Sequence, residues 1–203
     1  MELSKYKIVG IDPGLKGGIC IMDQYNKSIH LYKMPVKNKM IDYNAIKNII
    51  NSPNIKTIIL EYTTMIFGTS KHTAWEMGRQ IGIFEGLSNC FYLELFEVSP
   101  RKWQNYIFKS LYSEKLKHIP DDKTKLKSKK IFVDILKEEY FDYEIYYNDR
   151  KIERIKLDNK NIGLLSAIHR KKNNKEIKIR MNDGITDSFC ITLYYVKSQI
   201  NEQ

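Results

Sequence analysis

The chain of 203 residues contains little cysteine and little proline, with 3 and 5 residues respectively. The three cysteines, Cys20, Cys90 and Cys190, lie far apart within apolar runs, so the sequence holds no Cys-x-x-Cys motif and no Cys/His pair. Such spacing argues against a disulfide framework and against a zinc site. We therefore expect buried free thiols in a reducing compartment.

Long hydrophobic runs are also missing. No apolar stretch approaches the roughly 20 residues that cross a bilayer, and the first residues, MELSKYK, lack the apolar segment of a signal peptide. There is no internal repeat, low-complexity tract or linker. We expect one domain over residues 1–203 and an intracellular location without a membrane: the cytoplasm of a bacterium or of a virus-infected cell, or an organelle matrix.

A nucleophilic hydrolase signature is absent as well. The sequence shows no Ser-His-Asp or Cys-His pattern, and its four histidines, His30, His72, His118 and His169, are dispersed. An enzyme built on this chain would need a chemistry that uses no side-chain nucleophile.

Positive charge, in contrast, is abundant and localised. Residues 101–180 hold 22 Lys and Arg against 12 Asp and Glu, whereas the remainder holds 12 of each, so this block carries the whole net charge of +10. A localised basic region favours a polyanion such as nucleic acid, because binding releases counterions from phosphates. A solvated lysine-rich face is the alternative.

The hydrophobic pattern predicts an α/β fold. Three strands joined by short links, at residues 6–12, 18–23 and 28–34, indicate an antiparallel meander. An amphipathic helix over 42–52 then leads to a continuously apolar strand that ends at Glu61, which indicates a covered strand parallel to the first. The pattern continues with a helix over 72–89, a strand over 91–98, and helices over 101–108, 126–140 and 183–199. The result is a five-stranded mixed sheet, its first three strands antiparallel and the next two parallel, with helices on both faces.

The sequence pattern leaves two points open: what packs against the helix over 72–89, and which structure residues 141–180 adopt. Gly78, Gly82 and Gly86 recur every fourth residue in the helix over 72–89, so one helix face is open to close approach. We expect that face to pack on the sheet, with a partner subunit as the alternative. Residues 141–180 form a basic insertion that suits either a hairpin or a mobile segment.

Four carboxylates are placed to meet. Asp12 ends the first strand and Glu61 ends its parallel neighbour, so both lie at the sheet edge where such folds bind ligands. Asp183 and Asp187 are four residues apart on one face of the last helix. Each has a simpler interpretation: Asp12 as a turn residue before Pro-Gly, and the late pair as a helix cap and a first-turn acid.

If all four carboxylates share a pocket, their repulsion calls for divalent cations, and oxygen ligands favour Mg²⁺ or Mn²⁺. Two such ions catalyse phosphodiester hydrolysis without a protein nucleophile, which agrees with the missing signatures.

Five segments in order carry a resemblance: IVGIDPGLKGGI, IILEYTTMIFG, the glycine-rich helix, EVSPRKWQNYIF and NDGITDSFCITLYY. Together they resemble the RuvC-type Holliday-junction resolvases of the RNase H-like superfamily, most closely the phage, poxvirus and chloroplast branches. The resemblance touches most of residues 7–140 and 181–199. It implies an RNase H-like nuclease fold with Asp12, Glu61, Asp183 and Asp187 as catalytic metal ligands for Mg²⁺, with Mn²⁺ able to substitute.

The resemblance has departures and further implications. The family often spaces its last two acids by three residues and follows the Trp of its V-x-P-x-x-W segment with Lys, whereas Gln104 follows Trp103 here. Lys102 or Lys109 is the candidate replacement. The basic segment DDKTKLKSKK matches the family's phosphate-binding stretch, and two aromatic residues after Glu61 are candidates for base stacking. The nucleic-acid-binding candidates are Tyr62, Phe67, Lys102, Lys123, Lys125 and Lys129.

The leading hypothesis is therefore a Mg²⁺-dependent endonuclease that resolves four-way DNA junctions as a homodimer, because two symmetric cuts need two active sites related by a two-fold axis. Alternatives are a nuclease for other branched DNA or RNA–DNA hybrids, and a non-catalytic DNA-binding protein. An actin-like ATPase would need a second, related half, which the sequence does not contain.

Overall fold

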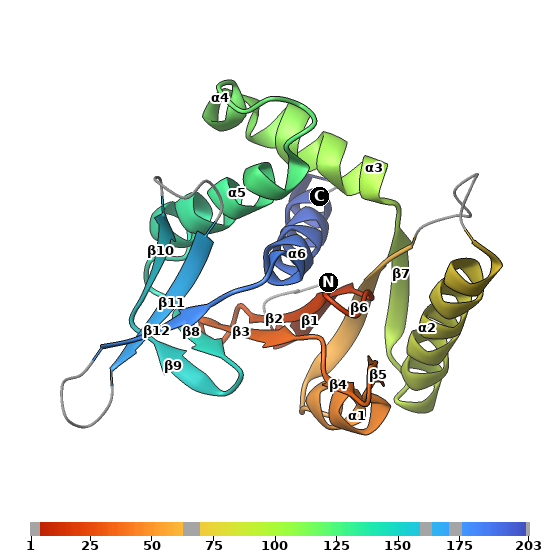
Figure 1. Ribbon diagram of the computed structural model, residues 1–203. Coiled ribbons are helices and arrows are strands. Elements are labelled where there is room, and N and C mark those ends of the chain that lie inside the picture. The colour runs from red at the N-terminus through yellow and green to blue at the C-terminus, as the bar shows by residue number, and fades with distance from the viewer. Residues whose placement is uncertain (1–4, 63–69, 159–163, 171–175, 202–203) are drawn as a thin grey trace.

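A computed structural model describes residues 5–62, 70–158, 164–170 and 176–201 (Figure 1). Its main sheet has the strand order β7-β6-β1-β2-β3-β8-β9. Five of these strands are the predicted ones: β1 (Lys7–Asp12), β2 (Gly18–Asp23), β3 (Ser28–Lys33), β6 (Ile55–Glu61) and β7 (Glu94–Val98). β1, β2 and β3 pair antiparallel, and β6 runs parallel to both β1 and β7. The predicted α/β class and mixed sheet are confirmed, and this strand arrangement is RNase H-like.

Two further strands extend the sheet to seven. β8 (Glu144–Tyr147) pairs parallel to β3, and β9 (Arg150–Ile152) returns antiparallel to β8. Their two-residue turn has positive φ at Asn148 (45°) and Asp149 (61°), the backbone that tight hairpins need. The first part of the basic insertion is thus a hairpin that continues the main sheet.

The rest of the insertion forms a separate sheet of three antiparallel strands, β10 (Arg154–Asp158), β11 (Leu164–Arg170) and β12 (Glu176–Arg180). β12 leads directly into the last helix (Figure 1). A small hairpin, β4 (Val36–Lys37) and β5 (Met40–Ile41), completes the strands.

Helices cover both faces of the main sheet (Figure 1). On one face lie α1 (Tyr43–Ile50) and α2 (Lys71–Cys90), which enclose a core with the β1 residues Val9 and Ile11. The other face carries α3 (Pro100–Gln104), the π-helix η2 (Asn105–Leu111), α4 (Ser113–Leu116), α5 (Thr124–Glu138) and α6 (Asp183–Asn201). Within the described residues, none of the helices combines the length and apolar character that a membrane crossing requires.

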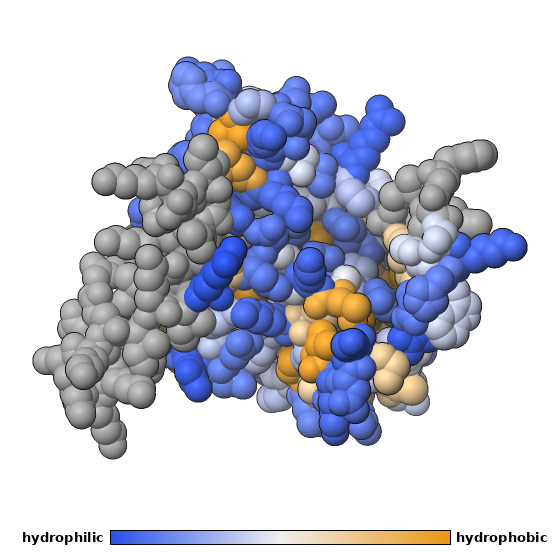
Figure 2. All heavy atoms as spheres, in the orientation of Figure 1, coloured by the Kyte–Doolittle hydropathy of each residue, from blue (hydrophilic) through white to orange (hydrophobic). Residues whose placement is uncertain are grey.

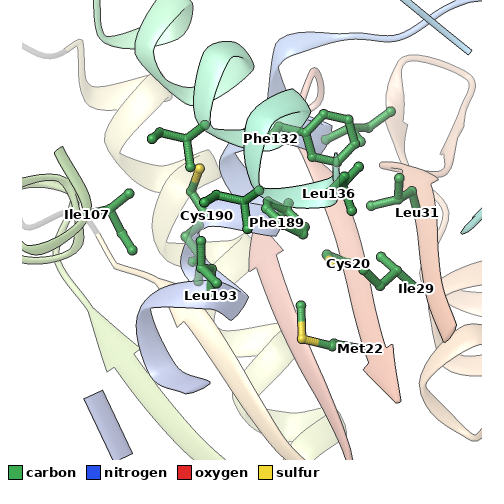
Figure 3. Close-up of a cluster of buried hydrophobic side chains, with 14 of the residues drawn as sticks. Cys20, Met22, Ile29, Leu31, Ile107, Phe132, Leu136, Phe189, Cys190 and Leu193 are labelled. Atoms are coloured by element: carbon green, nitrogen blue, oxygen red, sulfur yellow. The ribbon is translucent and has the colours of Figure 1, made fainter. Parts of the chain in front are cut away.

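The core between the main sheet and the helices α3 to α6 contains more aromatic side chains than the core under α1 and α2. Figure 3 shows part of it: Cys20 and Met22 from β2 meet α5 and α6, where Phe132 and Phe189 pack edge to face at 5.0 Å between ring centroids. α6 lies directly on β1, because a Cβ atom on Gly10 would come within 2.2 Å of Thr192 Oγ1. This contact fixes the last helix over the strand that ends in Asp12. The surface on the side shown in Figure 2 is mainly hydrophilic.

Two sequence-based expectations are wrong. Gly78, Gly82 and Gly86 do not face the sheet, since a Cβ atom on any of them would meet no atom of the described part of the chain within 4 Å. The buried residues of α2 are instead Gln80, Phe84 and Ser88 on the opposite side of the helix. Cys90, expected to be buried, is exposed at the end of α2, whereas Cys20 and Cys190 are buried free thiols as predicted.

Candidate active site

The structure brings the four predicted carboxylates to one end of the sheet. Asp12 is the last residue of β1, and Glu61 is the last residue of its parallel neighbour β6. Asp183 begins α6, and Asp187 follows one turn later. The acidic cavity here has a volume of about 950 Å³, and Asp12, Asp183 and Asp187 line it. Glu61 is close enough for the charges of Asp12 and Asp187 to raise its pKa, but it is not among the lining residues.

A glycine contact holds the two halves of the site together. A Cβ atom on Gly184 would lie 2.4 Å from the Cα of Gly17, so only hydrogen atoms fit between α6 and the β1–β2 turn. Asn182 closes the same contact, because its Nδ2 donates to the carbonyls of Lys16 (2.9 Å) and Gly17 (3.2 Å). The start of α6 is thereby fixed against the turn that carries Asp12.

Asp12 stabilises the β1–β2 turn and also lines the acidic cavity. Its Oδ1 accepts a hydrogen bond from the Gly14 amide at 3.3 Å, as the turn interpretation predicted. Burial raises the pKa of Asp12, and the hydrogen bond from Gly14 and the charge of Lys125 oppose that rise only in part. The turn and site interpretations are therefore compatible.

Among the four carboxylates, Glu61 and Asp187 have the largest pKa shifts. Burial, followed by the charge of Asp12, raises the pKa of Glu61 to about 7, although Trp103 Nε1 donates to Glu61 Oε2 at 2.7 Å and so opposes the shift. Burial also raises the pKa of Asp187 to about 7; a hydrogen bond with Ser128 opposes the rise, and the charges of Asp12 and Asp183 add to it. The charge of Lys125 opposes the rise at Asp187 only in part, so both carboxylates remain crowded and desolvated.

Asp183 differs because α5 supplies two lysines to it. Lys129 Nζ lies 2.6 Å from Asp183 Oδ1, and Lys125 Nζ lies 3.4 Å from Oδ2. Burial acts to raise the pKa of Asp183, but the hydrogen bond and charge of Lys129, together with Lys125, outweigh it and lower the pKa. The Lys129 side chain is only 10% exposed, so its ammonium is committed to this acidic end of the sheet.

The carboxylates form a donor set that suits a hard divalent cation. They are all oxygen ligands, and a bound cation would reverse the raised pKa values of Glu61 and Asp187. As arranged in the described part of the chain, however, no three or more His, Cys, Asp or Glu side chains are grouped closely enough to hold a metal ion. Binding would therefore require these side chains to move toward one another.

The predicted nucleic-acid-binding residues are dispersed. Lys125 and Lys129 line the acidic cavity, whereas Lys123 pairs with the neighbouring Asp122 at 3.2 Å and Lys102 lies exposed on α3 outside the cavity lining. The Tyr62 amide donates to the Val98 carbonyl at 2.9 Å, which extends the β6–β7 pairing. Phe67 falls outside the described residues.

Sequence reasoning missed several residues at the site. Lys16, Lys33 and Arg180 line the cavity and bring positive charge to its rim. Trp103, Asn182 and Gly184 position the acids. Gly184 left a signal, because a glycine inside the first turn of a helix needs a packing reason, and Trp103 stands in the V-x-P-x-x-W segment that the sequence already singled out.

Comparison with known proteins gives distant matches only. No family model matches the sequence, and no curated protein matches it. Among solved structures, the chain is similar to the Thermus thermophilus RuvC structure, with 10% identity and a TM-score of 0.49 over 95% of this chain and 96% of that one. T. thermophilus RuvC in complex with a Holliday junction substrate aligns with 10% identity and a TM-score of 0.40 over 50% of this chain and 69% of that one. The RNase H-like assignment therefore rests on the strand order and pairing of the chain itself.

Proposed function

We propose that this chain is a divalent-cation-dependent endonuclease that resolves four-way DNA junctions by paired nicks. The observation that carries the proposal is the convergence of Asp12, Glu61 and Asp187 at the carboxyl end of β1 and β6, where the charge of Asp12 raises the pKa of both Glu61 and Asp187. A sheet edge bearing crowded carboxylates, with no Ser, Thr, Cys, Tyr or His among the described residues that line its cavity, suits metal-assisted phosphodiester hydrolysis.

Asp12, Glu61, Asp183 and Asp187 would hold Mg²⁺, with Mn²⁺ able to substitute. Two such ions supply an activated water and stabilise the leaving 3′-oxygen. The protein's own contribution is placement: Trp103 orients Glu61, and the contact of Gly17 with Gly184 fixes the helix that carries the two aspartates. Support of this kind fixes the backbone that carries the carboxylates, so that only the side chains need to move when a cation binds.

The cationic rim suits the DNA backbone. Lys16, Lys33, Lys125 and Arg180 line the same cavity as the acids. Lys125 is 72% exposed and lies 3.4 Å from Asp183, so it can turn to a phosphate once that carboxylate binds a cation. Phosphate contacts of this type position a duplex without reading its sequence.

A homodimer follows from the symmetry of a junction, and α2 offers a surface for it. Gly78, Gly82 and Gly86 face open space on this helix, and Trp75, which lies at helical spacing on the same face, is 62% exposed. Three glycines in an exposed helix cost up to about 1 kcal/mol each relative to alanine. If a second copy of the chain packs closely against this face, that contact would explain why glycine occupies these positions despite its low helix propensity.

The test is cleavage of a synthetic four-way junction with and without Mg²⁺, beside linear duplex, flap and RNA–DNA hybrid substrates of matched length. We expect symmetric nicks that ligase can seal, only with the metal and chiefly on the junction. Asp12→Asn should lose cleavage and keep junction binding. Asp142→Asn, which removes a surface carboxylate paired with Lys27 outside the acidic cavity, is the matched control and should cut normally.

Each arm of that test has a distinct contrary result. Equal cutting of linear duplex would remove junction selectivity, and preferred cutting of the hybrid would reassign the substrate. Binding of a junction without cleavage at any Mg²⁺ or Mn²⁺ concentration would leave a non-catalytic DNA-binding protein.

A further inference from the structure

A second polar cavity lies on the other side of α5. It consists of two adjoining pockets of about 360 and 420 Å³, which share Phe108, Lys109, Asp121 and Lys127. Figure 1 shows α3, α4 and the start of α5 gathered at one end of the molecule. We call these two pockets together the α5 basic pocket. None of its lining residues belongs to the acidic cavity.

A buried lysine forms the base of this pocket. The Lys127 side chain is only 6% exposed, and its Nζ lies 2.5 Å from Asp121 Oδ1. Burying an ammonium is unfavourable unless an anion accompanies it. The anion here is a carboxylate that is 83% exposed and lies six residues away, just before the helix. The anion position beside Lys127 is therefore accessible from solvent.

Further positive groups surround the same position. Lys109, near the end of η2, adds its charge to that of Lys127 in lowering the pKa of Asp121, for which the hydrogen bond from Lys127 is the largest cause. Arg101 and Thr124 line the pocket from α3 and from the first residue of α5. No side-chain hydrogen bond caps the start of α5, and the positive end of the helix dipole points the same way.

We propose that the α5 basic pocket binds a phosphate group, and that Asp121 occupies the anion position until phosphate replaces it. The geometry supports this exchange because the cation is fixed and buried while its present partner is an exposed side chain. Two sources share the chemistry: inorganic phosphate and the phosphodiester backbone of DNA.

The proposal that the bound phosphate belongs to the DNA backbone rests on the proposed function. Lys125 and Lys129 face the acidic cavity, whereas Lys127 faces the α5 basic pocket, and a helix with its side chains is about 10–12 Å across. One DNA arm could therefore contact both sides of α5, with a phosphate in the pocket fixing the direction in which that arm leaves the acidic cavity.

The first experiment titrates inorganic phosphate into the metal-free protein and follows the amide resonances of Thr124 and Lys127. We expect Asp121→Asn to bind phosphate about threefold to tenfold more tightly than the wild type, because it removes the competing carboxylate. Lys109→Gln should bind more weakly. Lys47→Gln, which makes the same charge change on the distant helix α1, is the matched control and should leave the affinity unchanged.

Thermal unfolding of each variant separates binding from folding. If Asp121→Asn unfolds at lower temperature and gains no phosphate affinity, the ion pair is structural and the proposal is wrong. An unchanged or weaker affinity in a folded Asp121→Asn protein would overturn it equally. Because this arm uses neither DNA nor catalysis, its outcome does not depend on the proposed nuclease function.

The second experiment measures junction binding without metal as a function of salt. If the pocket holds a DNA phosphate, Lys109→Gln should reduce the slope of log affinity against log salt by about one, with Lys47→Gln unchanged. Phosphate binding with an unaltered slope would support the anion site and exclude DNA as its source. An unaltered slope with no phosphate binding would reject both.

Discussion

The indole of Trp103 donates from Nε1 to Glu61 Oε2 at 2.7 Å, joining α3 to the end of β6. This hydrogen bond lowers the pKa of Glu61 against the burial and the charge of Asp12 that raise it to about 7. It also holds one oxygen of the carboxylate in place, so Trp103 is a positioning residue for the acidic cavity.

Trp103→Phe should therefore reduce cleavage and shift its pH dependence. A hydrogen bond to a charged group contributes about 1.5–3 kcal/mol, so we expect about a tenfold to hundredfold loss at neutral pH. The acidic limb of the pH–rate profile should move to higher pH, because Glu61 ionises less readily without the donor. A uniform loss across pH would indicate a packing defect instead, since Trp103 also contacts Phe108 edge to face at 5.4 Å.

Gly184→Ala tests the contact between α6 and the β1–β2 turn. The added methyl group would lie 2.4 Å from Gly17 Cα and from the Lys16 carbonyl oxygen, so backbone must shift. Overpacking of this kind costs about 1–3 kcal/mol, and the shift would move Asp183 and Asp187 away from Asp12. We expect lower stability in urea unfolding and a larger loss in metal affinity.

Gly14→Ala is the matched control for that variant. It makes the same change in the β1–β2 turn that Gly184 contacts, but the added methyl group meets its nearest atom, Asp12 Oδ1, at an ordinary 3.7 Å. Its stability should stay within about 0.5 kcal/mol of the wild type. Equal destabilisation by both variants would mean that the turn tolerates no side chain, and the interpretation of Gly184 would fail.

The sequence predicts those site residues that belong to a local pattern, and it misses the contacts between residues that lie far apart in the chain. Asp12 and Glu61 were found because each ends an apolar strand, a local pattern that also implies their shared sheet edge. The contact of Gly17 with Gly184 and the hydrogen bond of Trp103 to Glu61 join residues far apart in sequence, so no periodicity reveals them. Their presence could be inferred only once the topology was known.

The same reasoning accounts for the fold. Long apolar elements such as β6 were predicted correctly, because burial on both faces dictates their composition. β8 and β9 are only four and three residues long, and β8 pairs with β3, more than a hundred residues earlier. The open glycine face of α2 was misassigned because glycine spacing shows that a face is bare and does not show what lies opposite it.

The crowded carboxylates predict an unusual pH dependence for the metal-free protein. The pKa values of Glu61 and Asp187 are raised to about 7 by burial and by neighbouring acids, whereas the unfolded chain titrates near its ordinary values. Between about pH 4 and pH 7 the folded state thus binds more protons than the unfolded state. Stability should fall as pH rises through this window, which urea unfolding at pH 5.5 and pH 8 would measure.

Divalent metal should remove that pH effect. At a Mg²⁺ concentration of 100 times its dissociation constant, the wild type should gain about 2.7 kcal/mol at pH 8. Glu61→Gln keeps an oxygen for Trp103 but loses the charge, so it should be more stable than the metal-free wild type at pH 8, by up to about 3 kcal/mol. It should also gain little from Mg²⁺. Greater stability of the metal-free wild type at pH 8 than at pH 5.5 would contradict the assignment.

The open face of α2 gives the last prediction, which concerns assembly. Gly82→Arg places a large charged side chain at the centre of the stripe formed by Gly78, Gly82 and Gly86, where no atom of the described residues would lie within 4 Å of an added Cβ. Because arginine forms helices better than glycine, the isolated protomer should become more stable by about 0.5–1 kcal/mol. If a second copy packs on this face, the same variant should dissociate the dimer.

Sedimentation equilibrium separates the two effects. We expect the wild type to be dimeric and Gly82→Arg to be monomeric at micromolar concentration, with junction cleavage reduced to single, unpaired nicks. Asn48→Arg, on the exposed face of α1, makes the same addition elsewhere and should remain dimeric. A dimer that tolerates Gly82→Arg would place its interface on another surface, because a charged side chain of that size cannot be buried between close-packed helices without a partner.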